Sequence, residues 1–202
     1  MKTTVFIFRH GEIDNPRDVM YGGNIDFPLN KKGEGQIKET VEDIKSKGYL
    51  ISRVYSSPLK RAISSSKIIQ GVFGIREPLI EDNLKDTWIP ALAGKPHITR
   101  DKIHAENTDE YSEKFAGLGN ERRENIVKRM RNVFDKVVEE NQGQIVAIVS
   151  HGDPIRFLIQ NLEHPNQETP SMHILVKTKY PKKGRAIKVL VENDKIKEIE
   201  YI

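Results

Sequence analysis

Two short apolar runs of this chain end in the same way, at a polar group with a histidine followed by a glycine. Residues 3–8 are followed by Arg9-His10-Gly11, and residues 144–149 are followed by Ser150-His151-Gly152. Runs of this length, rich in β-branched residues, are typical of strands buried on both faces of a parallel sheet. Ligands of such sheets bind beyond the carboxyl ends of the strands. We therefore expect His10 and His151 to converge in space.

The rest of the chain alternates between helix and strand patterns. Apolar residues have helical spacing in four segments, 33–48, 59–70, 121–140 and 155–162. Strand patterns are found in five further segments, 50–55, 75–80, 172–178, 186–191 and 195–201. Because parallel strands need a covering connection, this order predicts an α/β fold. The expected form is a three-layer α/β/α sandwich with a mostly parallel central sheet and an antiparallel strand at an edge.

The composition fits one domain that spans residues 1–202. Hydrophobic residues make up 37% of the chain and charged residues 31%, a balance typical of globular chains, with no apolar stretch of membrane-spanning length. The apolar run near the N-terminus is too short for a signal peptide, so we expect a cytoplasmic protein without a membrane partner. The segment 82–120 has little regular periodicity and is expected to be a covering insertion.

Several classes of chemistry are excluded or disfavoured by the residues present. The chain has no cysteine, which excludes disulfides, thiolate zinc sites and cysteine nucleophiles. The net charge of +4 comes from 33 basic and 29 acidic residues, and the basic residues are dispersed, so we expect no nucleic-acid partner. The histidines outside the two apolar runs lack metal-ligand spacing, and we expect no metal.

Arginines accompany both histidines. Arg9 precedes His10 directly, and Arg61 lies at the start of a helix that Ser57 and Pro58 introduce. Guanidinium groups bind phosphoryl oxygens bidentately and neutralise their charge. A neutral imidazole is a nitrogen nucleophile near pH 7, and flanking cations are expected to lower its pKa. The cluster predicts a phosphoryl-binding site with His10 as the nucleophile.

Four motifs that follow one another in order carry a family resemblance. They are Phe8-Arg9-His10-Gly11-Glu12, Asp26-Phe27-Pro28-Leu29 followed by Gly33, Ser56-Ser57-Pro58-Leu59-Lys60-Arg61-Ala62, and Val149-Ser150-His151-Gly152. In this order they resemble the histidine phosphatase superfamily, in its phosphoglycerate mutase-like branch. The resemblance spans residues 4 to about 158.

The resemblance implies a mechanism and a set of site residues. His10 would carry the phosphoryl group as a phosphohistidine, with its other ring nitrogen held by the carbonyl of Gly11. A carboxylic acid would protonate the leaving alkoxide, water would hydrolyse the intermediate, and neither a metal nor an organic cofactor is expected. The phosphoryl group would be bound by Arg9, Arg61, His151 and Gly152.

The resemblance leaves the proton donor and one polar contact open. In the family the acid follows the third strand in a Leu-x-Glu pattern. The pattern favours Glu81, whereas the spacing to Trp88 favours Asp82. Asn15 lies near the position of a phosphate-contacting asparagine of the family, but it also precedes Pro16, as an Asx-turn residue would.

The expected function is hydrolysis of a phosphomonoester on a small phosphorylated metabolite. Mutases that resemble this chain carry an Arg-His-Tyr-Gly segment near the acid, which is missing here, yet a cofactor-dependent phosphoglycerate mutase stays an alternative. A non-catalytic phosphate-binding module is a second alternative. The sequence also leaves open whether the chain forms a homodimer.

Basic residues of the insertion are candidates for binding a second negative group of the substrate. They are Lys85, Lys95, Arg100 and Lys102. Lys182 and Lys183, by contrast, are expected in a solvated turn.

Overall fold

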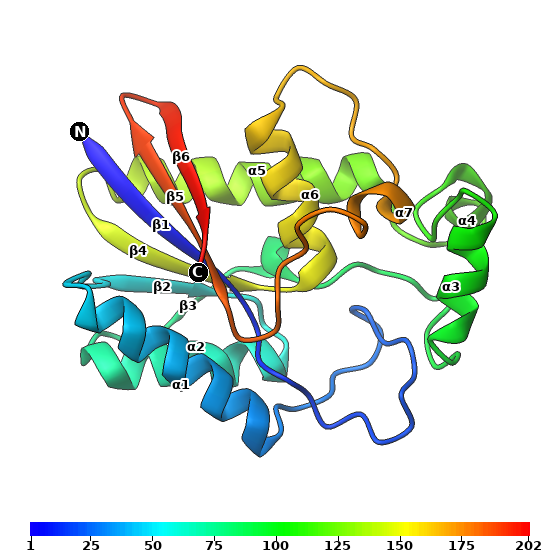
Figure 1. The fold of residues 1–202 in the computed structure, drawn as a ribbon, viewed down its shortest axis with the longest axis horizontal. Coiled ribbons are helices and arrows are strands. Elements are labelled where there is room, and N and C mark those ends of the chain that lie inside the picture. The colour runs from blue at the N-terminus through cyan, green and yellow to red at the C-terminus, as the bar shows by residue number, and fades with distance from the viewer.

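A six-stranded sheet in the order β3-β2-β4-β1-β5-β6 runs through the middle of the molecule (Figure 1). The computed structural model describes all of residues 1–202. The strands β3, β2, β4 and β1 pair in parallel, whereas β5 pairs antiparallel with both β1 and β6. This arrangement confirms the predicted fold class. The strands are β1 (Lys2–Arg9), β2 (Arg53–Ser56), β3 (Leu79–Ile80), β4 (Ile145–Ser150), β5 (Ala186–Glu192) and β6 (Lys195–Tyr201).

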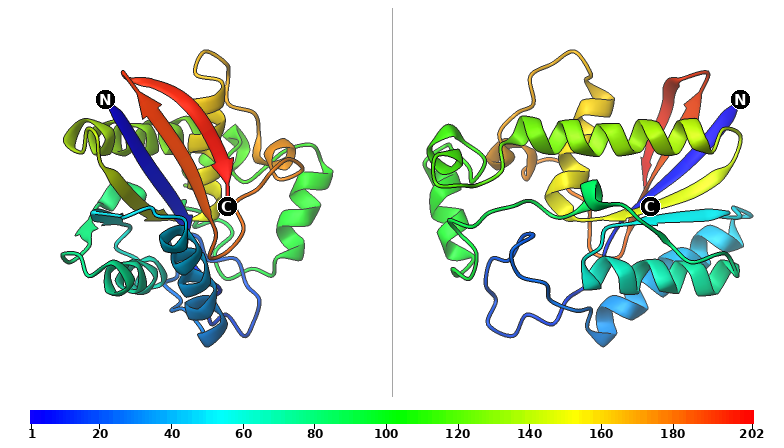
Figure 2. Two further views of the ribbon diagram at one scale, coloured as in Figure 1. Left: turned by 60° about the vertical axis from the view of Figure 1, so that its left-hand side comes forward. Right: turned by 180° about the vertical axis from the view of Figure 1, so that it is seen from behind.

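Helices cover both faces of the sheet (Figures 1 and 2). One face is covered by α1 (Lys31–Ser46) and α2 (Lys60–Phe73), and the other by α5 (Arg123–Glu140) and α6 (Gly152–Glu163). Successive side chains of a strand point to opposite faces. In β1, Val5 and Ile7 accordingly pack into the core cluster of α5 and α6, and Phe6 and Phe8 into that of α1 and α2. The run is apolar throughout because both of its faces are buried.

The segment expected as a covering insertion contains more regular structure than its sequence indicated. It includes the 3-10 turn η1 (Asp82–Leu84) and the helices α3 (Ile98–Ala105) and α4 (Glu113–Ala116). Figure 1 shows α3 and α4 (green) at the end of the molecule toward which β1 and β4 run. The insertion therefore lies on the side of the sheet where His10 and His151 are found.

Two strand predictions need correction. The strand expected at 172–178 is the short helix α7 (Met172–Leu175), in which Met172 and Leu175 both enter the core cluster beneath α5 and α6. Periodicity cannot separate helix from strand over so few apolar residues. The strand expected at 75–80 shortens to the two residues of β3, whose side chains are exposed at the edge of the sheet. No helix combines the length and the apolarity needed to cross a membrane.

Candidate active site

The register of the sheet brings the two histidines together. Arg9, at the end of β1, pairs with Ser150, at the end of β4, so His10 and His151 each follow directly after adjacent parallel strands. The backbone N–H of His10 donates to the carbonyl of Ser150 at 3.1 Å. The centroids of the two imidazole rings lie 5.1 Å apart, and both side chains are buried.

His10 is held in one tautomer by the next residue of the chain. Its Nδ1 lies 2.7 Å from the carbonyl oxygen of Gly11. Because a carbonyl only accepts hydrogen bonds, Nδ1 carries the proton and Nε2 keeps its lone pair. Burial holds the pKa of His10 well below its usual 6.5, and the positive charges of neighbouring groups, among them Arg61 and Arg9, act in the same direction. His10 is thus a neutral imidazole with a free nitrogen nucleophile.

His151 is neutral as well, but with the opposite tautomer. Nε of Arg61, which lies in the first turn of α2, donates to Nδ1 of His151 at 3.2 Å. Nε2 of His151 must then carry the proton, and it lies 2.8 Å from Oγ of Ser57. Burial, followed by the charge of Arg61, lowers the pKa of His151 well below 6.5. At Nε2, His151 therefore has an N–H donor rather than a lone pair.

The remaining donors of Arg61 are also paired, and two of their partners are carboxylates. Nη2 donates to the carbonyl of Gly22 and to Oδ2 of Asp86, both at 2.9 Å. Nη1 lies 3.4 Å from the carbonyl of Ile25 and 3.5 Å from Oδ1 of Asp26. An anion could bind to Arg61 only by displacing some of these hydrogen-bond partners. Of the two carboxylates, Asp86 is the nearer to Arg61.

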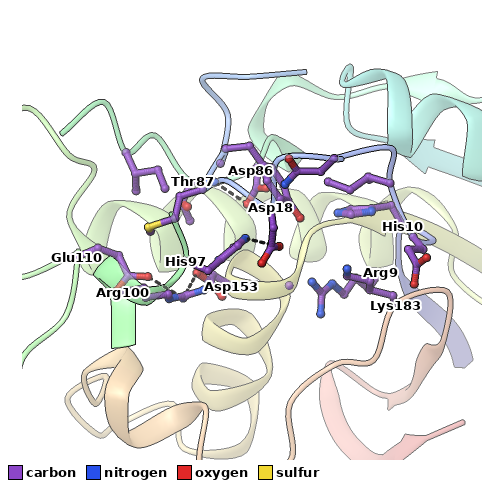
Figure 3. A pocket seen from close by; sticks show the side chains of 18 of the residues that line it. Arg9, His10, Asp18, Asp86, Thr87, His97, Arg100, Glu110, Asp153 and Lys183 are labelled. Atoms are coloured by element: carbon purple, nitrogen blue, oxygen red, sulfur yellow. Dashed lines mark hydrogen bonds and ion pairs between the residues drawn. The ribbon is translucent and has the colours of Figure 1, made fainter. Parts of the chain in front are cut away.

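A cavity of about 310 Å³ opens beside His10 (Figure 3). Arg9 lies on its wall, where it donates one hydrogen bond to the carbonyl of Pro181 at 3.0 Å and has no carboxylate partner. Gly152 lies on the same wall, and a Cβ there would collide with Tyr180 and come within 3.1 Å of Cζ of Arg9. Arg61 and His151 are fully buried and lie behind this wall rather than on it. The wall also includes Glu12, Asn15, Asp18, Tyr21, Gly22, Asp86, His97, Arg100, Glu110, Asp153 and Lys183.

The structure places the expected proton donor outside this cavity. Oε2 of Glu81 lies 2.9 Å from Nζ of Lys136 on α5, and Glu81 is not among the residues of the cavity wall. The side chain of Asp82 is largely exposed and pairs with Lys85. Neither carboxylate lines the cavity beside His10.

Asp86 is a carboxylate near Arg61 and His151 that the sequence did not single out as a candidate. It lines the cavity, and its Oδ2 lies 2.9 Å from Arg61 and 3.6 Å from Nδ1 of His151. A signal was present, because Leu84-Lys85-Asp86 repeats the Leu-x-acid spacing of Leu79-Ile80-Glu81 five positions later. Of the two leucines, Leu84 is fully buried and Leu79 is exposed, a difference that the motif alone does not reveal.

Asn15 lines the cavity, and its side chain does not form the expected Asx turn but pairs with the backbone of Val19, four residues further along the chain. Its Nδ2 donates to the carbonyl of Val19 at 2.8 Å, and the N–H of Val19 donates back to Oδ1 at 3.3 Å. Because both ends of the amide are engaged, a contact of Asn15 with phosphate stays a prediction.

The basic residues of the insertion differ in whether they line the cavity. Of the four candidates only Arg100 lines the cavity, and its Nη2 lies 2.6 Å from both Glu110 and Asp153. Its charge is therefore already neutralised. Lys183, expected in a solvated turn, instead lies on the cavity wall near Arg9 (Figure 3).

Buried neutral imidazoles beside arginines, at the ends of parallel strands, define a site for phosphoryl chemistry. Over residues 5–181 the sequence matches the family profile described as the histidine phosphatase superfamily (branch 1). The chain belongs to this superfamily, and the predicted family is confirmed.

Relatives agree with this assignment. The chain is 29% identical over 174 residues to the uncharacterized phosphatase PhoE of Bacillus subtilis, which covers 86% of this chain and 84% of that protein. It is 28% identical over 160 residues to phosphoglycerate mutase-like protein 4 of Arabidopsis thaliana, which covers 77% of this chain and 69% of that protein. The solved structure of Bacillus stearothermophilus YhfR has the same fold, with a TM-score of 0.80, 22% identity and coverage of 96% of this chain and 94% of that one.

Proposed function

We propose that this protein is a phosphomonoester hydrolase that acts on a small phosphorylated metabolite through a phosphohistidine on His10. The observation that carries the proposal is the state of His10, a buried neutral imidazole whose Nδ1 is bound to Gly11 and which lines the cavity together with Arg9. A fixed tautomer beside a guanidinium that has no carboxylate partner favours attack on an anionic phosphoryl group.

In the first half-reaction, Nε2 of His10 attacks phosphorus, and the bond from phosphorus to the leaving oxygen breaks. Arg9 binds the phosphoryl oxygens and offsets their charge. We assign the proton donor to Asp86 in place of Glu81. Asp86 lines the same cavity as His10, so its carboxylic acid can reach the oxygen of a leaving group bound there. Its proton then passes to the leaving alkoxide.

In the second half-reaction, water takes the place of the departed alcohol. The Asp86 carboxylate accepts a proton as the water oxygen attacks phosphorus, and the phosphorus–nitrogen bond to His10 breaks. Inorganic phosphate leaves, His10 recovers its lone pair, and Asp86 is protonated for the next cycle. Both half-reactions use the same two side chains on opposite sides of the phosphoryl group.

The direct test is hydrolysis of p-nitrophenyl phosphate with and without a chelator, in the wild type, in His10→Ala and in His164→Ala. His164 is an exposed histidine at the end of α6 and serves as the control. We expect chelator-insensitive phosphate release that falls by about 10³-fold or more in His10→Ala and is unchanged in His164→Ala. Activity that survives in His10→Ala would refute the nucleophile.

A mutase would share the first half-reaction and differ only in the acceptor of the phosphoryl group. The absence of an Arg-His-Tyr-Gly segment in the insertion supports water as the acceptor. With 3-phosphoglycerate and a 2,3-bisphosphoglycerate primer we expect inorganic phosphate and no 2-phosphoglycerate. The cytoplasmic location and the homodimer stay predictions from the sequence.

A further inference from the structure

Lys183 is fixed in place by the strand that carries the nucleophile. It lies in the loop that precedes β5, and the N–H of the next residue, Gly184, lies 3.2 Å from the carbonyl of Arg9 and 3.1 Å from that of His10. Gly184 has a φ of 72°, a backbone conformation that favours glycine. The loop is therefore tied to the end of β1, and Lys183 holds its place on the cavity wall through its backbone.

The charge of Lys183 has no counter-ion in the structure. No carboxylate lies within ion-pair distance of it, whereas Arg100 has two such partners. Of the acidic groups that face Lys183, Glu12 is paired with Lys32 at 2.9 Å and Asp18 is largely exposed. Burial and the positive charge of Arg9 lower the pKa of Lys183. Two neighbouring cations on one cavity wall thus lack any carboxylate partner.

The phosphoryl group does not need both of them. In the proposed mechanism its oxygens contact Arg9 and the N-terminus of α6 at Gly152, where a helix favours an anion. The cavity of about 310 Å³ is larger than one phosphoryl group and leaves room for the alcohol part of a small ester. Lys183 lines the same cavity. A single ammonium matches one singly charged carboxylate better than a second dianion, which arginine forks bind more effectively.

We propose that Lys183 binds a carboxylate on the leaving-group side of the substrate, so that the preferred substrates are small phosphorylated carboxylic acids. This inference rests on the proposed phosphatase function and adds a substrate class to it. Lys183 takes the role that the sequence suggested for the basic residues of the insertion, because none of those residues has a charge without a counter-ion on the cavity wall.

The test compares 3-phosphoglycerate with glycerol 3-phosphate, which differ only in that a hydroxymethyl group replaces the carboxylate. Hydrolysis of both is measured in the wild type, Lys183→Met, Lys183→Arg and Lys182→Met. Lys182 is an exposed neighbour that does not line this cavity. We expect Lys183→Met to lower kcat/KM for 3-phosphoglycerate about tenfold, mainly through KM, and to change the value for glycerol 3-phosphate by less than about twofold. Lys183→Arg should retain most of the preference, and Lys182→Met all of it.

A second measurement separates this inference from the catalytic proposal. The dissociation constants of both compounds are measured by calorimetry in His10→Ala, alone and combined with Lys183→Met. A preference for 3-phosphoglycerate that disappears with Lys183 supports the inference even if the wild type hydrolyses neither compound, a result that would refute only the phosphatase. Equal weakening of both compounds, or no weakening of either, would overturn the role of Lys183.

Discussion

At the scale of single residues, the positions of protons decide what each imidazole of the site can do. His10 and His151 are both buried and neutral, yet their hydrogen-bond partners differ in kind. A carbonyl acceptor fixes the proton of His10 on Nδ1, and a guanidinium donor fixes that of His151 on Nε2. One ring therefore has a free lone pair for the proposed attack on phosphorus while the other has an N–H donor, although both follow adjacent strands of the same sheet.

The assignment of Asp86 as proton donor predicts a dependence on the leaving group. Asp86→Asn cannot supply a proton, which matters most when the leaving alkoxide is strongly basic. We expect kcat/KM for an alkyl ester such as glycerol 3-phosphate to fall by about 10²-fold or more. The value for p-nitrophenyl phosphate, whose leaving phenolate is stable, should fall by less than about tenfold.

Glu81→Gln is the matched control for this prediction, since Glu81 pairs with Lys136 outside the cavity. It should leave the kinetics of both esters unchanged. If Glu81→Gln shows the leaving-group dependence instead and Asp86→Asn does not, the assignment made from the sequence motif is correct and that of the structure is wrong.

Most of these residues could be predicted from the sequence, because their positions are marked by neighbouring residues in the chain. Arg9, His10, Ser150 and His151 follow directly after apolar runs, so the end of each run marks their position. Asp86 has no such mark, because its place depends on a tertiary contact. The carbonyl of Leu84 accepts a hydrogen bond from Oγ of Ser150 at 2.8 Å, which ties the turn before Asp86 to the end of β4. A spacing motif contains no information about that contact.

At the scale of secondary-structure elements, the loop after β1 packs tightly against the start of α1. Asn30 caps α1 by accepting from the N–H of Gly33 at 2.8 Å, and its Nδ2 donates to Glu12 at 3.1 Å. A Cβ at Gly33 would overlap the backbone of Glu12, and a Cβ at Gly11 would overlap the backbone of Gly33. Two glycines therefore allow the helix to approach the loop that follows His10.

This close approach predicts opposite effects for two glycines of the same helix. Gly33→Ala must displace the backbone of Glu12 and should lower the free energy of unfolding by about 1–3 kcal/mol. Gly35 has no atom within 4 Å of its Cβ position, so Gly35→Ala should raise that free energy by about 0.5–1 kcal/mol through helix propensity. Chemical denaturation of both variants measures the difference. Equal shifts in the two variants would show that the contact with the loop does not limit position 33.

Elements were predicted well where both faces or one full helical stripe are buried, and poorly elsewhere. The run that became β1 and the spacing that became α5 are read directly from apolar positions. The four residues of α7 are too few to show either the helical or the strand periodicity of apolar residues. The helix α3 has only one buried residue, Ile103, and so shows no apolar stripe. Its position depends instead on Arg100, which contacts Asp153 in the first turn of α6, a long-range ion pair that periodicity does not register.

At the scale of the whole molecule, one buried carboxylate connects the insertion, the start of α6 and the loop before β5. Asp153 accepts hydrogen bonds from Arg100 and Tyr111 of the insertion and from Tyr180 of the loop before β5. The ring of Tyr180 lies against the guanidinium of Arg9, 5.4 Å from its centroid. The cavity wall is thus one connected network, and Arg9 is positioned by groups from three distant parts of the chain.

The same connections predict how a break in the network affects stability. Asp153→Asn keeps the shape of the side chain but removes the charge that pairs with Arg100, and Tyr180→Phe keeps the ring beneath Arg9 while removing one hydrogen bond. We expect Asp153→Asn to lower the free energy of unfolding by about 2 kcal/mol or more, because the partly buried Arg100 loses one of its two carboxylate partners. Tyr180→Phe should cost about 1 kcal/mol. Thermal or chemical denaturation measures both changes. A larger loss of unfolding free energy in Tyr180→Phe than in Asp153→Asn would contradict the prediction.

The two buried histidines make the stability of the whole fold depend on pH. Each has a folded-state pKa well below 6.5, whereas in the unfolded chain the pKa is about 6.5. Below pH 6.5 the unfolded state therefore binds more protons than the folded state, and the free energy of unfolding falls as the pH falls. Between pH 7 and 5.5 we expect a loss of about 1 kcal/mol for each of His10 and His151.

Urea denaturation at the two pH values, in the wild type and in the double variant His10→Gln/His151→Gln, isolates this contribution. The quantity compared is the change in unfolding free energy with pH, so a lower absolute stability of the variant does not affect the test. Other titrating groups contribute equally to both proteins, and the double variant should lose about 2 kcal/mol less than the wild type between pH 7 and 5.5. His164→Gln, at an exposed position, should behave as the wild type. If the double variant retains the full pH dependence, the two imidazoles are not buried as neutral groups, and the lone pair on which the proposed attack of His10 depends is not secured by the fold.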